Sequence, residues 1–205
     1  MKTHIYPAIK ITVVLLVLLA VIYPAVVWAI AQLAPNHGKG AVISYHDQKY
    51  YKNIGQSFTD EAYFWSRPSA VAYNAAGSGG SNKGPSNPEY LTEVKARIDT
   101  FLRDNPGVSR GQVPVDLVTA SGSGLDPDIS VAAAKIQVAR IAKARAIDAN
   151  SLQSLVDAHV QKPIAGMFGP EKINVLELNI ALDQMTEKLM WRPDDTKTIN
   201  DDQIN

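Results

Sequence analysis

The sequence predicts an α+β protein, in which one N-terminal transmembrane helix precedes a helix-rich domain with a small sheet. Three observations indicate this fold class. Residues 11–31, ITVVLLVLLAVIYPAVVWAIA, contain no charge over 21 positions. Later segments repeat apolar residues at helical spacing, whereas runs typical of strands are few and short. We therefore expect an N-terminal tail at 1–10, a folded domain at 32–190 and a polar C-terminal tail at 191–205.

The apolar run is long enough to cross a bilayer as a helix. At 1.5 Å per residue, its 21 residues match the roughly 30 Å of hydrocarbon in a typical membrane. Tyr23 and Trp28 lie toward its far end, where amphipathic rings favour the headgroup level. Pro24 predicts a local kink near Tyr23, which membrane helices tolerate.

A cleaved signal peptide is the alternative interpretation of this run. Residues 29–31, AIA, match a small-x-small cleavage pattern. Signal cores have about 7 to 15 apolar residues, however, and this run is longer, which favours an uncleaved signal anchor. Lys2, Lys10 and the terminal amine precede the run, while Lys39 and Lys49 follow it. The two lysines on each side balance, so only the terminal amine gives the N-terminal side more positive charge, which slightly favours a cytoplasmic N-terminus.

Composition excludes several classes of function. The 20 Lys and Arg residues, less Lys2 and Lys10, leave 18 basic against 20 acidic residues beyond the span, so nothing indicates a nucleic-acid partner. The absence of Cys excludes disulfides, thiolate zinc sites and a Cys nucleophile. The four His residues lack the HxxxH spacing of a helical metal site, and we expect His159 to flank the core.

Helical periodicity is clearest in four segments. Residues 87–103 begin with Asn at the cap and Pro at the first helical position. The Ala-rich residues 131–147 predict a helix of about four turns. Residues 150–160 predict another helix, and a last one opens at Asn174, with Glu177 three residues on as in a capping box.

Strand signals are weaker than the helical ones. Residues 113–119, VPVDLVT, carry β-branched side chains and partial alternation, and Pro114 suggests an edge strand. Residues 41–43 and 54–58 are two further short candidates. We therefore expect only a small sheet.

Two Gly-rich loops invite a phosphate-binding interpretation that their residues do not support. No GxxxxGK[ST] motif occurs, and acidic Asp126 and Asp128 in the second loop would repel phosphate. Neither Ser121 nor Ser123 sits in a GxSxG motif. The carboxylates that could form a catalytic acid pair are better explained by turns and helix starts; they are Asp116, Asp126, Asp128 and Asp183.

The first of these loops has the features of a shaped loop rather than a linker. Residues 66–88 read SRPSAVAYNAAGSGGSNKGPSNP, and bulky side chains within such a run seek partners. Aromatic residues 63–65 precede it and the helix at Asn87 follows it, so both ends are pinned. We expect Arg67 and Tyr73 to anchor the loop.

Several motifs in order along the chain make the sequence similar to the KdpC family, the C subunit of the bacterial high-affinity potassium-transporting Kdp ATPase. The resemblance covers the span to about residue 185, and the motifs are Ile54-Gly55-Gln56, Tyr63-Phe64, Arg67-Pro68-Ser69, Tyr73-Asn74, Ser78-Gly79-Gly80-Ser81-Asn82, PVDLVTAS at 114–121, Gly124-Leu125-Asp126-Pro127, Asn174-Val175-Leu176, Leu178-Asn179 and Leu182-Asp183. The sequence departs locally at Val131, where the family pattern has Pro, and at Gly169-Pro170-Glu171, which reorders a Gly-x-Pro turn.

The resemblance implies a non-catalytic, single-pass subunit of the bacterial inner membrane with its domain outside the cytoplasm. Its implied partners are a potassium-channel-like subunit, a P-type ATPase subunit, a small membrane peptide and the lipid bilayer. Family members are described as catalytic chaperones that raise the pump's affinity for ATP. We expect no cofactor on this chain alone, with ATP reached only through the complex. The expected loop or partner contacts are Arg67, Tyr73, Ser78, Asn82, Asp126, Gln137 and Arg140.

The basic residues of the 131–147 segment bear on nucleotide binding. Lys135, Arg140, Lys143 and Arg145 surround a continuous helix instead of converging on one spot, which predicts separate salt bridges. The domain alone is therefore expected not to bind ATP. A membrane-anchored extracytoplasmic ligand-binding domain that acts alone remains the alternative function, and copurification with partner subunits separates the two.

Overall fold

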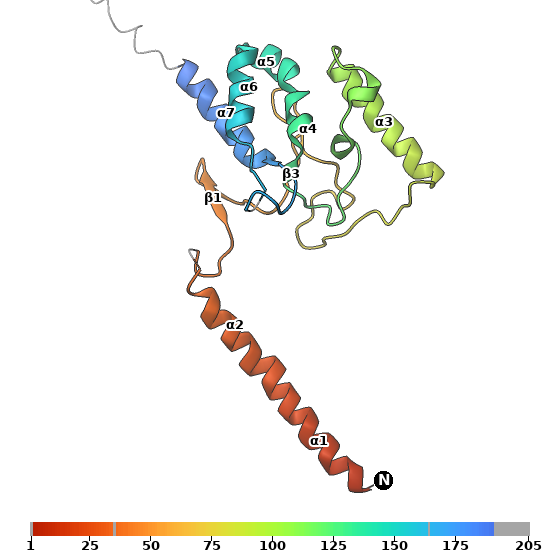
Figure 1. Ribbon diagram of the computed structural model, residues 1–205, viewed down its shortest axis with the longest axis vertical. Helices are drawn as coiled ribbons and strands as arrows, with labels where there is room; N and C mark the ends of the chain where they lie inside the picture. The colour runs from red at the N-terminus through yellow and green to blue at the C-terminus, as the bar shows by residue number, and fades with distance from the viewer. Residues whose placement is uncertain (1, 35, 164, 191–205) are drawn as a thin grey trace, which may run out of the picture. The chain divides into compact units, whose positions relative to one another are not determined.

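The computed structural model describes residues 2–34, 36–163 and 165–190 (Figure 1). The polar tail predicted at 191–205 lies outside the described residues. The chain forms two compact units, residues 1–51 and 52–205, and each is described by itself.

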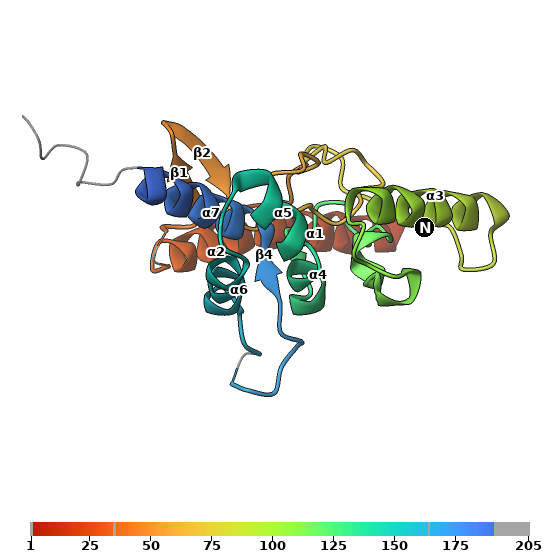
Figure 2. The ribbon, with the colours of Figure 1, turned by 90° about the horizontal axis from the view of Figure 1, so that it is seen from above.

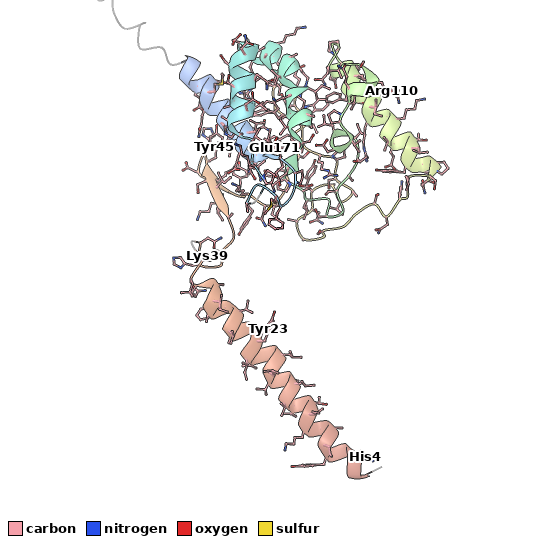
Figure 3. All side chains as sticks on the ribbon, viewed as in Figure 1. His4, Tyr23, Lys39, Tyr45, Arg110 and Glu171 are labelled. Atoms are coloured by element: carbon pink, nitrogen blue, oxygen red, sulfur yellow. The ribbon has the colours of Figure 1, made fainter. Side chains whose placement is uncertain are left out.

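The first unit begins with one long helix in three parts, α1 (Lys2–Val17), the π-helical η1 (Leu18–Ile22) and α2 (Tyr23–Ala31). Within it, His4–Ala31 is a 28-residue stretch that contains an 18-residue window with a mean hydropathy of 2.8, and it is apolar and long enough to cross a membrane. None of this stretch is buried, and its side chains stand outward around the helix (Figure 3). The apolar helix of the predicted fold class is therefore present.

Pro24 explains the π-helical turn. Proline has no N–H and its ring clashes with the carbonyl four residues earlier, so an α-helical ladder cannot run through it unchanged. The chain widens in the turn before Pro24, where the Tyr23 N–H donates to the carbonyl of Leu18, five residues back. Such π turns are a known way to absorb an interruption in a helix. The irregularity expected near Tyr23 thus lies in the turn that precedes it.

A β-hairpin completes the first unit. Strands β1 (Val42–Tyr45) and β2 (Gln48–Tyr51) pair antiparallel, with Val42 opposite Tyr51 and Tyr45 opposite Gln48. The two-residue turn between them has positive φ at both His46 (46°) and Asp47 (59°). A turn with positive φ at both positions matches the right-handed twist of the strands, and Asp and His tolerate this conformation better than most residues.

The second unit is rich in helices and contains one two-stranded sheet, β3 with β4, in which Asp128 pairs with Asn174 and Ile129 with Ile173. Figures 1 and 2 show α4 to α7 grouped together, with α3 apart from them. The elements are α3 (Pro88–Asp104), the 3₁₀ turns η2 (Arg110–Gln112) and η3 (Val115–Leu117), β3 (Asp128–Ile129), α4 (Val131–Lys135), α5 (Val138–Arg145), α6 (Ala149–Ala158), β4 (Ile173–Asn174) and α7 (Val175–Met190).

One hydrophobic core holds these elements together. Its fully buried members come from α4, α5, α6, β4, α7 and the loop before α3, and include Phe64, Ile141, Leu152, Ile173 and Leu178. Helix α3 joins the core through Phe101, whose ring meets Trp65 edge-on with centroids 6.0 Å apart. Burying large apolar side chains of this kind contributes about 1.5 to 3 kcal/mol each.

The strand predicted at 113–119 is wrong, because this segment forms tight turns instead. The N–H of Leu117 donates to the Pro114 carbonyl at 3.2 Å, and the N–H groups of Val118 and Thr119 donate to the Val115 carbonyl at 3.1 and 2.9 Å. These bonds close within the segment, so its β-branched composition does not translate into a strand. The strand predicted at 41–43 is confirmed, with its bounds shifted to Val42–Tyr45.

Two further predictions need correction. Residues 54–58 form no strand; the Gly55 N–H donates to the Leu125 carbonyl at 2.7 Å, in a contact between two loops. The helix predicted over 131–147 is divided into α4 and α5 at Gln137. The Gln137 N–H donates to Ala134, three residues back, while its side-chain amide donates to the Ala133 carbonyl at 2.9 Å. The side chain therefore takes a carbonyl that a continuous helix would have bonded through its backbone.

Candidate functional site

Residues 61–65 pass the core of the second unit without forming a strand. Side chains, rather than a neighbouring strand, supply hydrogen-bond partners for their backbone groups. Phe64 is fully buried. Its N–H donates to Oδ1 of Asn179 at 2.9 Å, and its carbonyl accepts from Nδ2 of the same residue at 3.0 Å. One buried amide on α7 thus pairs both backbone groups of Phe64. Buried backbone groups need such partners, since an unpaired one costs about 1 to 3 kcal/mol.

Gln137 and Arg140, at the start of α5 and within it, bond the rest of this segment. Oε1 of Gln137 accepts from the Trp65 N–H at 2.8 Å and from Nη2 of Arg140 at 2.8 Å. Arg140 also donates to the carbonyl of Glu61 through Nη1 and to that of Tyr63 through Nη2, the latter at 3.1 Å. The two predicted site residues on this helix therefore act together on one stretch of backbone.

The Arg140 guanidinium is buried, and each of its three nitrogens donates a hydrogen bond. Its Nε donates to Asn105 Oδ1 at 3.2 Å, and its Cζ lies 4.5 Å from the centroid of the Trp65 ring. Burial lowers the pKa of Arg140 to about 10, with the nearby carboxylates of Asp104 and Glu61 acting in the opposite direction. The group stays protonated at neutral pH, and its donors are directed at the protein itself.

Arg145 extends the same arrangement toward α7. Its Nε donates to the Ala62 carbonyl at 2.7 Å, and its Nη1 lies 2.7 Å from Oδ1 of Asp183, in a pair whose side chains are only 11% and 20% exposed. Tyr63 donates to the other carboxylate oxygen of Asp183 at 3.1 Å and lies beneath the guanidinium, 4.4 Å from Cζ to the ring centroid. Sequence reasoning missed this role of Arg145, because helical spacing places it about 140° around the helix from Arg140 and does not show which loop it would meet.

The four basic residues of the 131–147 segment thus have different surroundings. Arg140 and Arg145 bind backbone carbonyls of residues 61–63, and Lys135 pairs with Asp157 of α6 at 2.9 Å. Lys143 lines an open cavity of about 610 Å³ beside Arg103 and Asp104. They do not converge on a common point. Lys135 and Arg145 form separate salt bridges, as expected, whereas Arg140 binds neutral carbonyl and amide oxygens instead.

The two Gly/Ser-rich loops, residues 66–82 and 119–126, lie against each other; we call this pair the double loop. The carbonyl of Ser123 accepts from the Gly79 N–H at 2.8 Å and from the Ser78 hydroxyl at 3.1 Å. The Ser69 hydroxyl donates to the Gly124 carbonyl at 2.6 Å. Bonds between the loops, together with bonds within each, therefore set their shape.

Arg67 and Tyr73 lie at the centre of the double loop. Nη1 of Arg67 binds Oδ2 of Asp126 at 2.7 Å, and both side chains are largely shielded from solvent. The Tyr73 hydroxyl donates to the Arg67 carbonyl, while the Tyr73 N–H donates to the Ser69 hydroxyl at 2.9 Å. Burial raises the pKa of the Tyr73 hydroxyl, so it remains a donor at neutral pH. The positive φ of Tyr73, 58°, shows that these contacts hold an unfavourable backbone conformation.

Glycine is required where the two loops approach most closely. Gly124 has φ +66°, and a Cβ there would lie 2.6 Å from Cγ2 of Val71 and 2.8 Å from the Gly79 carbonyl oxygen. A Cβ on Gly55 would lie 2.6 Å from the Asp126 carbonyl oxygen. Sequence reasoning placed Gly55 in a short strand and Gly124 in a Gly-rich loop, and missed that both permit loop-to-loop contact.

The predicted site residues fall into two groups in the structure. The double loop contains Arg67, Tyr73, Ser78 and Asp126. Gln137 and Arg140 belong instead to a second group, the polar side chains on α5 and α7 that bond the backbone of residues 61–65, which we call the clamp. Asn82 is joined to neither group by a side-chain bond that the structure describes; it has φ 54° and an exposed side chain. Beside the double loop lies an open cavity of about 670 Å³, lined by Arg67, Ser78, Ser123 and Asp126 among others.

The carboxylates considered as a catalytic pair have separate structural partners. Asp116 accepts from the N–H and hydroxyl of Ser130 at the start of α4, and Asp128 pairs with Lys172 at 2.5 Å. Asp126 and Asp183 pair with Arg67 and Arg145 as described above. Among the described residues, no cluster of three His, Asp or Glu side chains is arranged to hold a metal ion. The arrangement is suited to presenting a shaped surface rather than to bond chemistry.

Replacing Asn179 by Leu tests the clamp on Phe64. We expect Asn179→Leu to lower the stability of the protein by about 2 to 4 kcal/mol, because two buried backbone groups lose their partners at nearly constant side-chain volume. Thermal unfolding of the full chain in detergent, followed by circular dichroism, measures the change. Asn150→Leu, at an exposed position on α6, is the matched control. Equal unfolding temperatures for both variants would contradict this role.

Replacing Arg67 by Ala tests the centre of the double loop. We expect Arg67→Ala to cost about 1 to 3 kcal/mol of stability, because a shielded charge-assisted bond is lost and Asp126 remains. Arg110→Ala breaks a pair with Asp99 in which both side chains are about half exposed. That control should cost under about 1 kcal/mol. If the two variants unfold alike, the Arg67 pair does not anchor the loops.

Comparison with known proteins places this chain among membrane transport subunits. The profile of the KdpC family, described as K⁺-transporting ATPase, c chain, matches residues 5–184. The potassium-transporting ATPase KdpC subunit of Flavobacterium johnsoniae is 54% identical over 89% of this chain and 98% of its own length. Those of Bacteroides fragilis and Caldanaerobacter subterraneus are 50% and 44% identical, over 92% and 89% of this chain and 100% and 95% of their own lengths. The chain therefore belongs to the KdpC family, the non-catalytic subunits of the Kdp potassium-transporting ATPase complex.

Proposed function

We propose that this chain is an accessory subunit that assembles with, and stabilises, the channel-like and P-type ATPase subunits of the Kdp complex. The observation that carries the proposal is the 28-residue apolar helix, none of which is buried, joined to a domain whose polar groups are bound internally. A helix of this kind needs lipid or other membrane helices around it. It supports a retained, single-pass anchor in the bacterial inner membrane.

The domain is proposed to lie outside the cytoplasm, with residues 1–10 on the cytoplasmic side. The family resemblance supports this orientation, since the charges flanking the span are nearly balanced. The chain has no Cys, so a single cysteine placed at exposed Asn150, on α6 and outside the double loop, reports its side of the membrane. Labelling of Asn150→Cys by a membrane-impermeant maleimide in spheroplasts is expected, and labelling only after lysis would reverse the orientation.

The double loop is the proposed docking surface toward the channel-like subunit. Its backbone is held by the bonds of Ser69, Ser78 and Arg67, so little further ordering is needed when a partner binds. Pre-organised surfaces bind with smaller losses of conformational entropy. The cavity of about 670 Å³ beside Arg67 gives this face a concave region for a partner side chain.

An effect on the pump's ATP affinity is proposed to be indirect. Arg140 and Arg145 donate to the protein's own carbonyls, and Lys135 pairs with Asp157, so these cations do not form a phosphate site. A domain outside the cytoplasm also cannot reach cytoplasmic ATP. The subunit can instead favour one pump conformation by contacting it better than another, and coupling of this kind needs only that difference in affinity.

Copurification distinguishes this proposal from an anchored ligand-binding domain that acts alone. We expect the tagged full chain, expressed with the other Kdp subunits and extracted in mild detergent, to bring those subunits with it. The intact mass of the recovered chain should include residues 1–31. Recovery of the chain alone would support the solitary receptor, and a mature chain beginning at Gln32 would refute the retained anchor.

Calorimetric titration tests the indirect role. The full chain in detergent is expected to show no saturable binding of ATP, because Arg140, Arg145 and Lys135 are bound internally and do not converge on one spot. Lys143→Ala is the informative variant, since Lys143 lines the open cavity and lies outside the clamp on residues 61–65. Saturable one-to-one binding by the unmodified chain that is lost in Lys143→Ala would contradict an indirect role. The assembled complex, which hydrolyses ATP, serves as the positive control.

A further inference from the structure

The connection between α6 and β4, residues 159–172, extends away from the helices of the second unit (Figure 2). At its base, the N–H of Gln161 donates to the Lys172 carbonyl at 2.8 Å, and the N–H of Lys172 donates to the Gln161 carbonyl at 3.2 Å. Nζ of Lys172 also binds Asp128 of β3 at 2.5 Å. The base of the connection is therefore an extension of the β3–β4 sheet.

The outer part of the connection, residues 165–170, is shaped by its backbone; we call it the tip loop. The N–H of Gly166 donates to the Pro163 carbonyl at 2.9 Å. Positive φ angles occur at Ala165 (54°), Gly166 (72°) and Gly169 (92°). Three such positions in five residues describe a tight reversal of the chain, which glycine favours.

The tip loop presents two large apolar side chains to solvent. Met167 is 77% exposed and Phe168 is 66% exposed. Among the described residues of the second unit, the other strongly exposed large apolar side chains are Leu91 and Val115, which stand singly. Single exposed apolar residues are ordinary, whereas an adjacent Met–Phe pair on a projecting turn is typical of a contact with another molecule.

The charges around the tip loop indicate whether the Met–Phe pair contacts lipid or another protein. No charge occurs from residue 165 to 170, and the flanking Lys162 and Glu171 cancel. Lys172 is paired with Asp128. A loop that adsorbs to anionic lipid usually carries basic residues that no acidic residue neutralises. Here the charges of Lys162 and Lys172 are balanced by those of Glu171 and Asp128. An uncharged Met–Phe centre with a balanced polar rim instead matches the composition of protein–protein contacts.

We propose that Met167 and Phe168 enter an apolar pocket on another subunit of the Kdp complex. This inference rests on the proposed function and names a second docking point, separate in sequence from the double loop. Two side chains make a small contact by themselves. The subunit is already held beside its partners by the membrane helix, however, so a small contact forms at high effective concentration. The shaped backbone of the tip loop reduces the loss of freedom further.

The double variant Met167→Ser with Phe168→Ser tests the contact in the assembled complex. We expect at least a tenfold lower recovery of the other Kdp subunits after a stringent detergent wash, as for the loss of a central aromatic anchor. Val115→Ser is the matched control, because Val115 is 70% exposed and lies outside the tip loop. It should leave recovery unchanged. The unfolding temperature of all variants should equal that of the unmodified chain, since the altered side chains are exposed.

Site-specific photocrosslinking identifies the occupant. A benzoylphenylalanine at position 168 is expected to form an adduct with another Kdp subunit, and one at position 115 is not. Adducts only with lipid or with a second copy of this chain would overturn the proposal, as would unchanged recovery of the double variant. If the unmodified chain itself brings no other subunit, the proposed function fails together with this inference. If the unmodified chain recovers the other subunits and the double variant recovers them equally well, the inference alone fails.

Discussion

The structure of the second unit depends on pairing the backbone of residues 61–65 inside a core that supplies no neighbouring strand. Buried N–H and carbonyl groups need partners, and a sheet is the usual source. Here the partners are long polar side chains on two helices, with Asn179 bonding both groups of Phe64 and Arg140 bonding the carbonyls of Glu61 and Tyr63. The positions of α5 and α7 are tied to this segment, and the rest of the core is built around them.

This arrangement has a consequence for the chemistry of the domain. Cations that would be available in a nucleotide site are bound to the protein's own carbonyls and carboxylates, as Arg140 and Arg145 show. The same holds for the loops, where Asp126 is bound to Arg67 rather than to a ligand. Networks of this kind rigidify a protein when every member is satisfied. A rigid domain with few free functional groups suits a subunit that acts through the shape of its surface.

The rigid domain carries two surfaces of different character, the double loop and the tip loop. The double loop is concave, polar and internally bonded, whereas the tip loop is a projecting turn with two exposed apolar side chains. Both are attached to the same core, the first through residues that follow the clamped segment and the second through the β3–β4 sheet. A subunit held by its membrane helix can use two such modest contacts together, because the anchor makes each of them effectively intramolecular.

Features that depend on neighbours along the chain could be predicted from the sequence. The apolar helix, the Asn87 and Asn174 caps, the helical faces and the fold class were predicted from composition and spacing, and the structure confirms them. The ordered motifs also identified the family correctly. Local patterns suffice here because helix formation, capping and membrane insertion are decided within a few turns of chain.

Where backbone groups find partners across long separations depends on the tertiary structure. VPVDLVT has the composition of a strand, yet no strand of the described residues pairs with it, and its N–H groups bond within the segment. Gln137 interrupts a helix because its side-chain amide bonds the Ala133 carbonyl and the distant Trp65 N–H, and Gly124 must be glycine because Val71 and Gly79 approach it from another loop. These outcomes depend on which segments meet in space. A buried polar group is satisfied by whatever partner the folded chain brings near it, and that partner can lie more than a hundred residues away, as Asn179 does from Phe64.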